Sequence, residues 1–224
     1  MISTQALRKR SHEILQKSGG RYEIHELLPP MDEAIPCLRR SCSEIQNRAL
    51  AMYIFILRLV DGERFLDYDR TWLLSHGLYS CLTDDEQQIF NMPDACLTES
   101  KKETYLDMVE GLYALCWLLG KENELNINGY VPDNLVRHFP VADVNDGVPS
   151  IAAPSMDSFC TLRDSIEVAQ MWDVYYCMHW SMVEERVNGI VIERNINVWT
   201  VIERRRALEW ALSNDAWDEI SLDT

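Results

Sequence analysis

The chain has 224 residues, of which 47% are hydrophobic and 25% are charged. This composition is typical of a globular protein with a proper core, and we expect one domain over residues 1–224. Acidic side chains number 36 against 21 Lys and Arg, giving a formal net charge of -15. Nucleic acid and anionic membrane surfaces are therefore disfavoured as partners, because both require a surplus of basic side chains on one face. A basic protein partner is favoured by electrostatic steering.

The N-terminal stretch MISTQALRKRSHEILQ has no apolar core, so no signal peptide is expected. The most apolar run, residues 49–60, contains Arg58 and falls well short of the roughly 20 residues needed to span a bilayer. The seven cysteines are odd in number and show no CxxC motif. Reduced thiols in a cytoplasmic protein are the expectation that follows.

Helical periodicity predicts elements over residues 3–18, 42–60, 67–81, 83–91, 99–119, 161–186 and 196–213. Ser3 is a suitable cap for the first of these, and Gly19 follows its end. Thr83 with Glu86 three residues later predicts a capping box. The predicted fold class is all-α, a single globular domain of about seven or eight helices.

Two segments break the helical pattern. Residues 121–160 contain four prolines and predict a long irregular connection with one helical turn near 133–138. A connection of that length is either a functional segment or a variable insertion. Residues 187–198 are rich in β-branched side chains and include Asn188-Gly189, so a short β-hairpin is expected there.

Three consecutive arginines lie in the last predicted helix. At about 100° per residue they point in three directions. Arg205 shares an apolar stripe and is expected to be buried, unless its head reaches solvent or pairs with Glu209 one turn later. Arg206 lies near Glu203 on a stripe bordered by two tryptophans. Arg204 shares the face of the smallest residues, which predicts that it faces solvent.

Two carboxylates lie among apolar residues. Asp173 lies on an apolar stripe of the 161–186 helix, and Glu110 lies on a helix that is apolar nearly all round. A buried carboxylate is costly unless it is paired and hydrogen-bonded. We therefore expect these two, together with Glu167, Arg205 and Arg206, to form one internal ion-pair network.

Five sequence motifs cover most of the chain: RKRSHEIL at 8–15, LRRSCSEIQNRALA at 38–51, LTDDEQ at 82–87, EGLYALCWLLG at 110–120 and LRDSIEVAQMWDVYYCMHW at 162–180. Their order and spacing resemble a bacterial family known as domain of unknown function 4272. That family tends to carry an arginine shortly before a His-Trp pair, whereas Cys177 and Met178 precede His179 here. The resemblance implies one domain over the chain and implies no activity.

Motifs of known catalytic sites are absent from the sequence, including GxSxG, GxGxxG, HExxH and a Walker loop. The five histidines are far apart, and His179 is expected to be a packed core residue rather than a general base. We expect no cofactor and no metal. Glu110, Glu167 and Asp173 can act as paired carboxylates only if they converge on a pocket.

Two functions are favoured over a third, a structural subunit of a homo-oligomer for which apolar residues in 187–198 supply an exposed edge. The first is a non-catalytic cytoplasmic binding protein whose acidic surface meets a basic protein, as an immunity or inhibitor protein does with a toxin. The alternative is an enzyme or ligand-binding protein that uses a buried carboxylate and arginine cluster. The candidates for that cluster are Glu110, Glu167, Asp173, His179, Glu203, Arg205 and Arg206. A concave pocket lined by them favours the second function, and a filled core with paired charges favours the first.

Overall fold

The computed structural model describes residues 3–24, 28, 37–139, 142–145, 148–151 and 161–223. These residues form the α-helices α1 (Thr4–Ser18), α2 (Cys42–Asp61), α3 (Leu66–Ser75), α4 (Asp84–Phe90), α5 (Glu99–Leu106), α6 (Met108–Leu118), α7 (Ser165–Val187) and α8 (Val198–Leu212). Short 3-10 turns occur at Gly62–Phe65, Tyr79–Cys81, Asp94–Cys96 and Leu135–His138. The predicted all-α class is confirmed, as is the helical turn near 133–138.

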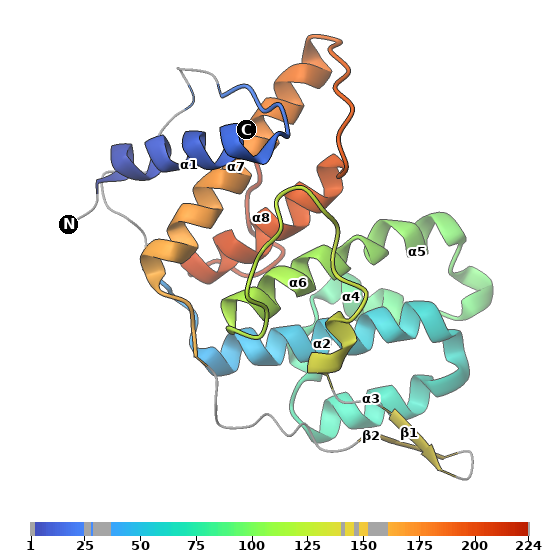
Figure 1. Cartoon of the computed structure of the whole chain (residues 1–224). Coiled ribbons are helices and arrows are strands. Elements are labelled where there is room, and N and C mark those ends of the chain that lie inside the picture. Colours follow the sequence, from blue (N-terminus) through green and yellow to red (C-terminus); the bar gives the residue numbers. More distant parts are fainter. Residues whose placement is uncertain are drawn as a thin grey trace.

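Helix α8 lies at the centre of the fold (Figure 1). It packs against both α6 and α7, while α1 covers α7 and α2 covers α6. Gly111 allows α6 to approach α8 closely, since a Cβ there would stand only 3.3 Å from the carbonyl oxygen of Glu203. One hydrophobic core runs through α2, α6, α7 and α8.

Several helix ends follow the signals in the sequence. The Ser3 side chain accepts a hydrogen bond from the Ala6 amide at the start of α1, and Gly19 ends that helix with a φ of 73°. A capping box opens α4, as predicted, with Thr83 and Glu86 satisfying each other's backbone amides. Each of these contacts satisfies a backbone group that a helix end leaves unpaired.

The helix predicted over 99–119 is two helices that meet at Asp107. Helix α5 has no buried residue, whereas almost every residue of α6 is buried. Residues of α5 lie at the surface and residues of α6 lie in the core, and one straight helix does not place both segments in this way. The helix predicted over 67–81 is also shorter, because Gly77 adopts a φ of +68° after α3.

The hairpin predicted over 187–198 is wrong. Asn188-Gly189 ends α7 instead of turning between two strands, with Gly189 at a φ of +68° and the Ile190 amide donating to the Glu185 carbonyl at 2.8 Å. This is the Schellman arrangement, which needs the same left-handed glycine as a tight hairpin turn. The chain then returns without strands to α8, and Arg194 binds Glu185 at 2.6 Å on the way.

A two-stranded antiparallel hairpin does occur elsewhere, between β1 (Ala142–Asn145) and β2 (Val148–Ile151). It falls within the 121–160 connection, where the sequence predicted irregular structure. Of the cysteines expected to be reduced, Cys37, Cys81, Cys96, Cys116 and Cys177 form no disulfide, and Cys160 lies outside the described residues. The expectation is wrong for Cys42, which is disulfide-bonded.

Candidate functional site

Arg204 is the most deeply buried of the three arginines of α8. Its small neighbours predicted that it faces solvent, and this prediction is wrong, because none of its surface is exposed. Its Nε lies 2.8 Å from Oε2 of Glu110, which is itself only 3% exposed. The guanidinium also donates to the Tyr175 hydroxyl at 3.0 Å and to the carbonyls of Asn126 and Gly129. The buried charge is thereby compensated, as stability requires.

The same ion pair fixes residues 121–131, the start of the long connection. Oε1 of Glu110 accepts a hydrogen bond from the Val131 amide at 3.1 Å. The Tyr113 hydroxyl donates to the carbonyl of Glu124 at 2.6 Å. This irregular segment is therefore attached to α6 and α8 by buried polar groups.

Arg163 attaches the beginning of that segment to the start of α7. It lies over the Trp117 ring at 4.8 Å and donates to the carbonyl oxygens of Glu122 and Asn123 at 2.6 and 2.9 Å. Its Nη1 lies 2.9 Å from Oε1 of Glu167, one helical turn later. Glu167 therefore forms a local pair at the surface and does not join the buried network.

Asp173 has a different partner from the one predicted. Its carboxylate is fully buried and lies 2.8 Å from Nη2 of Arg8 on α1. The Ser11 hydroxyl donates to it at 2.5 Å. Arg205 and Arg206 do not contact it, so the single network expected from the sequence is not formed. The role of Asp173 is to join α1 to α7.

Arg205 is buried, as predicted from its apolar stripe, and its ion-pair partner is Glu209 on the same helix. Its Nε lies 3.1 Å from Oε2 of Glu209, and its Nη1 lies 2.8 Å from Nδ1 of His179. Burial and the Arg205 charge lower the pKa of His179 to about 4, so the ring is neutral at pH 7 and accepts this hydrogen bond. Arg205 also donates to the carbonyls of Leu222 and Asp223, both at 3.2 Å, and so holds the C-terminal segment.

Arg206 and Glu203 complete the predicted set, with an Nε to Oε1 distance of 3.5 Å on one helix face. The seven predicted residues thus lie in separate pairs across the fold. Glu110, Asp173 and His179 are buried with partners, and they do not converge on a pocket. The buried cluster proposed from the sequence is a set of structural anchors, and the open sites lie beside it.

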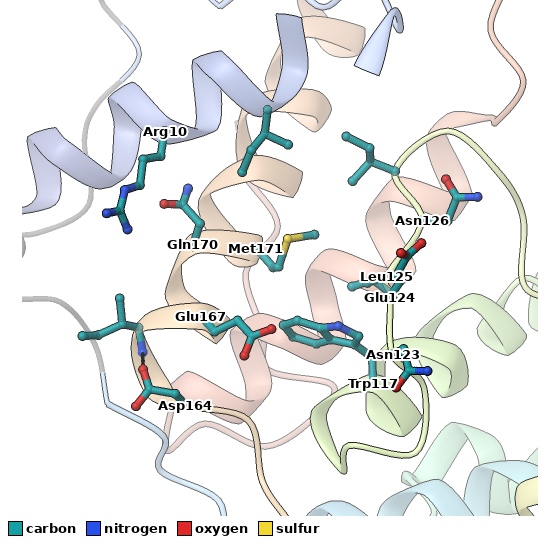
Figure 2. Close-up of a pocket in the computed structure, with 13 residues that line it drawn as sticks. Arg10, Trp117, Asn123, Glu124, Leu125, Asn126, Asp164, Glu167, Gln170 and Met171 are labelled. Carbon is teal, nitrogen blue, oxygen red and sulfur yellow. Dashed lines mark hydrogen bonds between the residues drawn. The ribbon is translucent and has the colours of Figure 1, made fainter. Parts of the chain in front are cut away.

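One open site is a cleft of about 790 Å³, which we call the α1–α7 cleft. It is formed by α1, the end of α6, residues 123–127 and the start of α7. Figure 2 shows Trp117 and Met171 in the middle of this cleft, with Arg10 at one side and Glu124 at the other. Of the predicted residues, Glu167 lines it.

A second open site, which we call the acidic cleft, has a volume of about 580 Å³ between α4, α5, the start of α8 and residues 217–218. The six carboxylates that line it are Asp85, Glu86, Glu103, Asp107, Glu203 and Asp218. Arg206 is the one basic side chain among its lining residues. The predicted residues Glu203 and Arg206 therefore lie here.

Two of these carboxylates already have a basic partner, since Glu86 binds Arg48 at 2.6 Å and Glu203 pairs with Arg206. The other four form no ion pair among the described residues. Burial raises the pKa of Asp107, and burial also raises the pKa of Glu203. The aromatic rings of Tyr105, Trp199 and Trp217 share the lining. Trp199 is 56% exposed, which is unusual for a large apolar side chain.

Neither cleft offers a ligand set for a metal ion. Within the described residues, no three His, Cys, Asp or Glu side chains stand close enough together to hold one. None of the described helices has the length and apolar character needed to cross a membrane.

The fold and these sites define a predominantly helical domain with buried arginine–carboxylate pairs, the α1–α7 cleft and the acidic cleft. A family model described as a domain of unknown function, DUF4272, matches residues 7–220, and the chain belongs to this family. Comparison with curated proteins and with solved structures gave no significant match.

Proposed function

We propose that this chain is a non-catalytic binding protein whose acidic cleft receives a basic segment of a protein partner. The observation that supports the proposal is the unbalanced charge of the cleft. Four of its carboxylates, those of Asp85, Glu103, Asp107 and Asp218, form no ion pair among the described residues. A Lys or Arg side chain from a partner would provide the missing positive charge.

The aromatic side chains favour the same kind of ligand. Trp199 stands exposed at the start of α8, four residues before Glu203. An indole face attracts an ammonium or guanidinium group through the ring quadrupole, and nearby carboxylates strengthen that attraction. The elevated pKa of Asp107 fits this account, because a bound cation would stabilise the ionised carboxylate that burial disfavours.

We further propose that the partner is a basic toxin or a comparable protein and that this chain inhibits it, as an immunity protein does. The overall charge of -15 supports this, since it attracts a basic protein at long range. We place the protein in the cytoplasm, where the exposed free thiols of Cys37 and Cys96 would persist. The disulfide at Cys42 argues in the other direction, and counting the free thiols of the protein isolated from its own cells decides between the compartments.

The proposal is tested by capture from lysate with three forms of the chain. The first is the wild type. The second, the cleft-neutral variant, carries Glu103→Gln, Asp107→Asn and Asp218→Asn. The third, the surface-neutral variant, carries Glu13→Gln, Asp133→Asn and Glu193→Gln, which removes the same charge from exposed carboxylates outside both clefts.

A basic protein retained at low salt by the wild type and the surface-neutral variant, and lost by the cleft-neutral variant, is the expected result. Equal retention by all three forms would show that binding depends on overall charge or on another surface. Retention of nothing by the wild type at either salt would leave the acidic cleft without a basic protein partner and overturn the proposal.

The alternative of an enzyme or ligand-binding protein built on the buried cluster has less support. Glu110 and Asp173 are buried and already bind Arg204 and Arg8. Neither carboxylate lines either of the two clefts. A ligand-binding role is instead supported by the α1–α7 cleft.

A further inference from the structure

The α1–α7 cleft is preorganised, because each of its walls is fixed from behind by an arginine. Arg8 binds Asp173 and thereby holds α1 on α7. Arg204 donates to the carbonyl of Asn126 and holds the 123–127 wall. Arg163 lies over Trp117. A site whose walls are already in place requires little ordering when a ligand binds.

The lining of the cleft is largely apolar, with charged side chains on two opposite sides and the polar groups of Glu167 and Gln170 between them. Met171 and Ile127 provide apolar surface, and Trp117, which is only 3% exposed, contributes little. Arg10 is exposed and its side chain forms no ion pair or hydrogen bond within the described part of the chain. The Glu124 carboxylate is likewise exposed and without such a partner. Figure 2 shows these two residues on opposite sides of the apolar lining.

We propose that the α1–α7 cleft binds a short peptide with free termini and an apolar side chain between them. The C-terminal carboxylate would bind the Arg10 guanidinium, and the N-terminal ammonium would bind the Glu124 carboxylate. The apolar side chain would lie on Met171 and Ile127. The separation of the two charges across the cleft favours a peptide over a free amino acid, in which the two charged groups are attached to one carbon atom. This inference is independent of the acidic cleft.

Isothermal titration with the tripeptide Ala-Phe-Ala tests the proposal, alongside its N-acetylated and C-amidated forms and free phenylalanine. Blocking either terminus removes one charge-assisted hydrogen bond, and we expect the affinity to fall about tenfold in each case. Free phenylalanine is expected to bind more weakly still. The cleft-neutral variant is expected to bind the tripeptide as the wild type does, which separates this proposal from the one for the acidic cleft.

Two variants assign each terminus to its residue. Arg10→Met is expected to weaken the free peptide about tenfold and to leave the C-amide unaffected, because the amide has already lost that contact. Glu124→Gln is expected to weaken the free peptide about tenfold and to leave the N-acetylated peptide unaffected. Lys9→Met is the matched control, since Lys9 is an exposed cation on α1 that does not line the cleft. All three positions are exposed, so thermal unfolding should be unchanged.

Absence of tripeptide binding at millimolar concentration would overturn the proposal. Equal affinities for the free, acetylated and amidated peptides would also overturn it, because the charged ends of the cleft would then have no role. Binding of free phenylalanine as tight as that of the tripeptide would place one amino acid in the cleft and contradict the two-ended arrangement.

Discussion

Replacing Arg204 by methionine should destabilise the protein strongly. The side chain is fully buried, and its loss leaves the Glu110 carboxylate, only 3% exposed, without its guanidinium partner. Removing one member of a buried pair typically costs about 3–5 kcal/mol. Small domains have a total stability of about 5–15 kcal/mol, so the variant should still fold but with a much lower denaturation midpoint.

A double-mutant cycle measures the coupling between the two residues. Glu110→Gln alone should also be costly, whereas the Arg204→Met, Glu110→Gln variant should lose less than the sum of the two single changes by about 2 kcal/mol or more. The assay is urea unfolding followed by tryptophan fluorescence. Lys102→Met is the control, because its 2.9 Å pair with the exposed Glu99 lies at the surface and should contribute less than about 1 kcal/mol. A loss for Arg204→Met no larger than for this control, or strictly additive costs, would refute the reasoning.

Three further predictions concern other positions. Burial and the nearby Asp61 raise the pKa of Asp69 to about 7, so ionising Asp69 opposes folding and the wild type loses stability between about pH 4 and pH 7. Asp69→Asn avoids this loss. With solvent screening included, urea unfolding should show the variant about 2 kcal/mol more stable than the wild type at pH 8. At pH 4 the two proteins should be equally stable. Gly111→Ala should lower the melting temperature, because the new methyl group would press on the Glu203 carbonyl at 3.3 Å; an unchanged melting temperature would mean that α6 and α8 are not tightly packed there. Trp199→Ala should leave the melting temperature unchanged, because the indole is 56% exposed, while reducing capture of a basic partner; a marked drop in melting temperature would assign Trp199 to the core.

Helix positions and caps could be predicted because their causes are local. Ser3, Thr83 and Gly19 act on backbone groups within four residues of themselves, so the sequence contains both partners. The error at Asn188-Gly189 shows the limit of such signals. A left-handed glycine serves a helix end and a tight hairpin equally well, and the surrounding helix decides between them.

The exposure of Arg204 was predicted wrongly for a physical reason. Its neighbours Thr200 and Ala211 are small, and a face of small residues predicts exposure to solvent. Both are buried, because small side chains on α8 let α6 approach closely, as Gly111 does from the other side. The burial of Asp173 was correctly predicted from its stripe, but its partner Arg8 lies 165 residues away, and helical periodicity gives no information about which distant residue it meets.

The two clefts could not be predicted from the sequence either. Each is lined by segments that are far apart along the chain, such as α4 and α8 in the acidic cleft. Nothing in the sequence distinguishes Arg10 or Glu124 from the many other charged residues. The significance of these two residues comes from their positions on opposite sides of one cleft and from the lack of a partner for either among residues 3–24, 28, 37–139, 142–145, 148–151 and 161–223.

Photo-cross-linking from position 199 shows directly whether a basic partner occupies the acidic cleft. Trp199 is replaced by a photoreactive phenylalanine derivative, and the same residue is placed at Tyr130, which is 51% exposed and does not line the acidic cleft. Position 199 is expected to cross-link to a basic protein at low salt and less so at high salt, and position 130 is expected not to cross-link. Equal cross-linking from both positions, or none from position 199 while the partner is still captured, would contradict the assignment of the acidic cleft as the binding site.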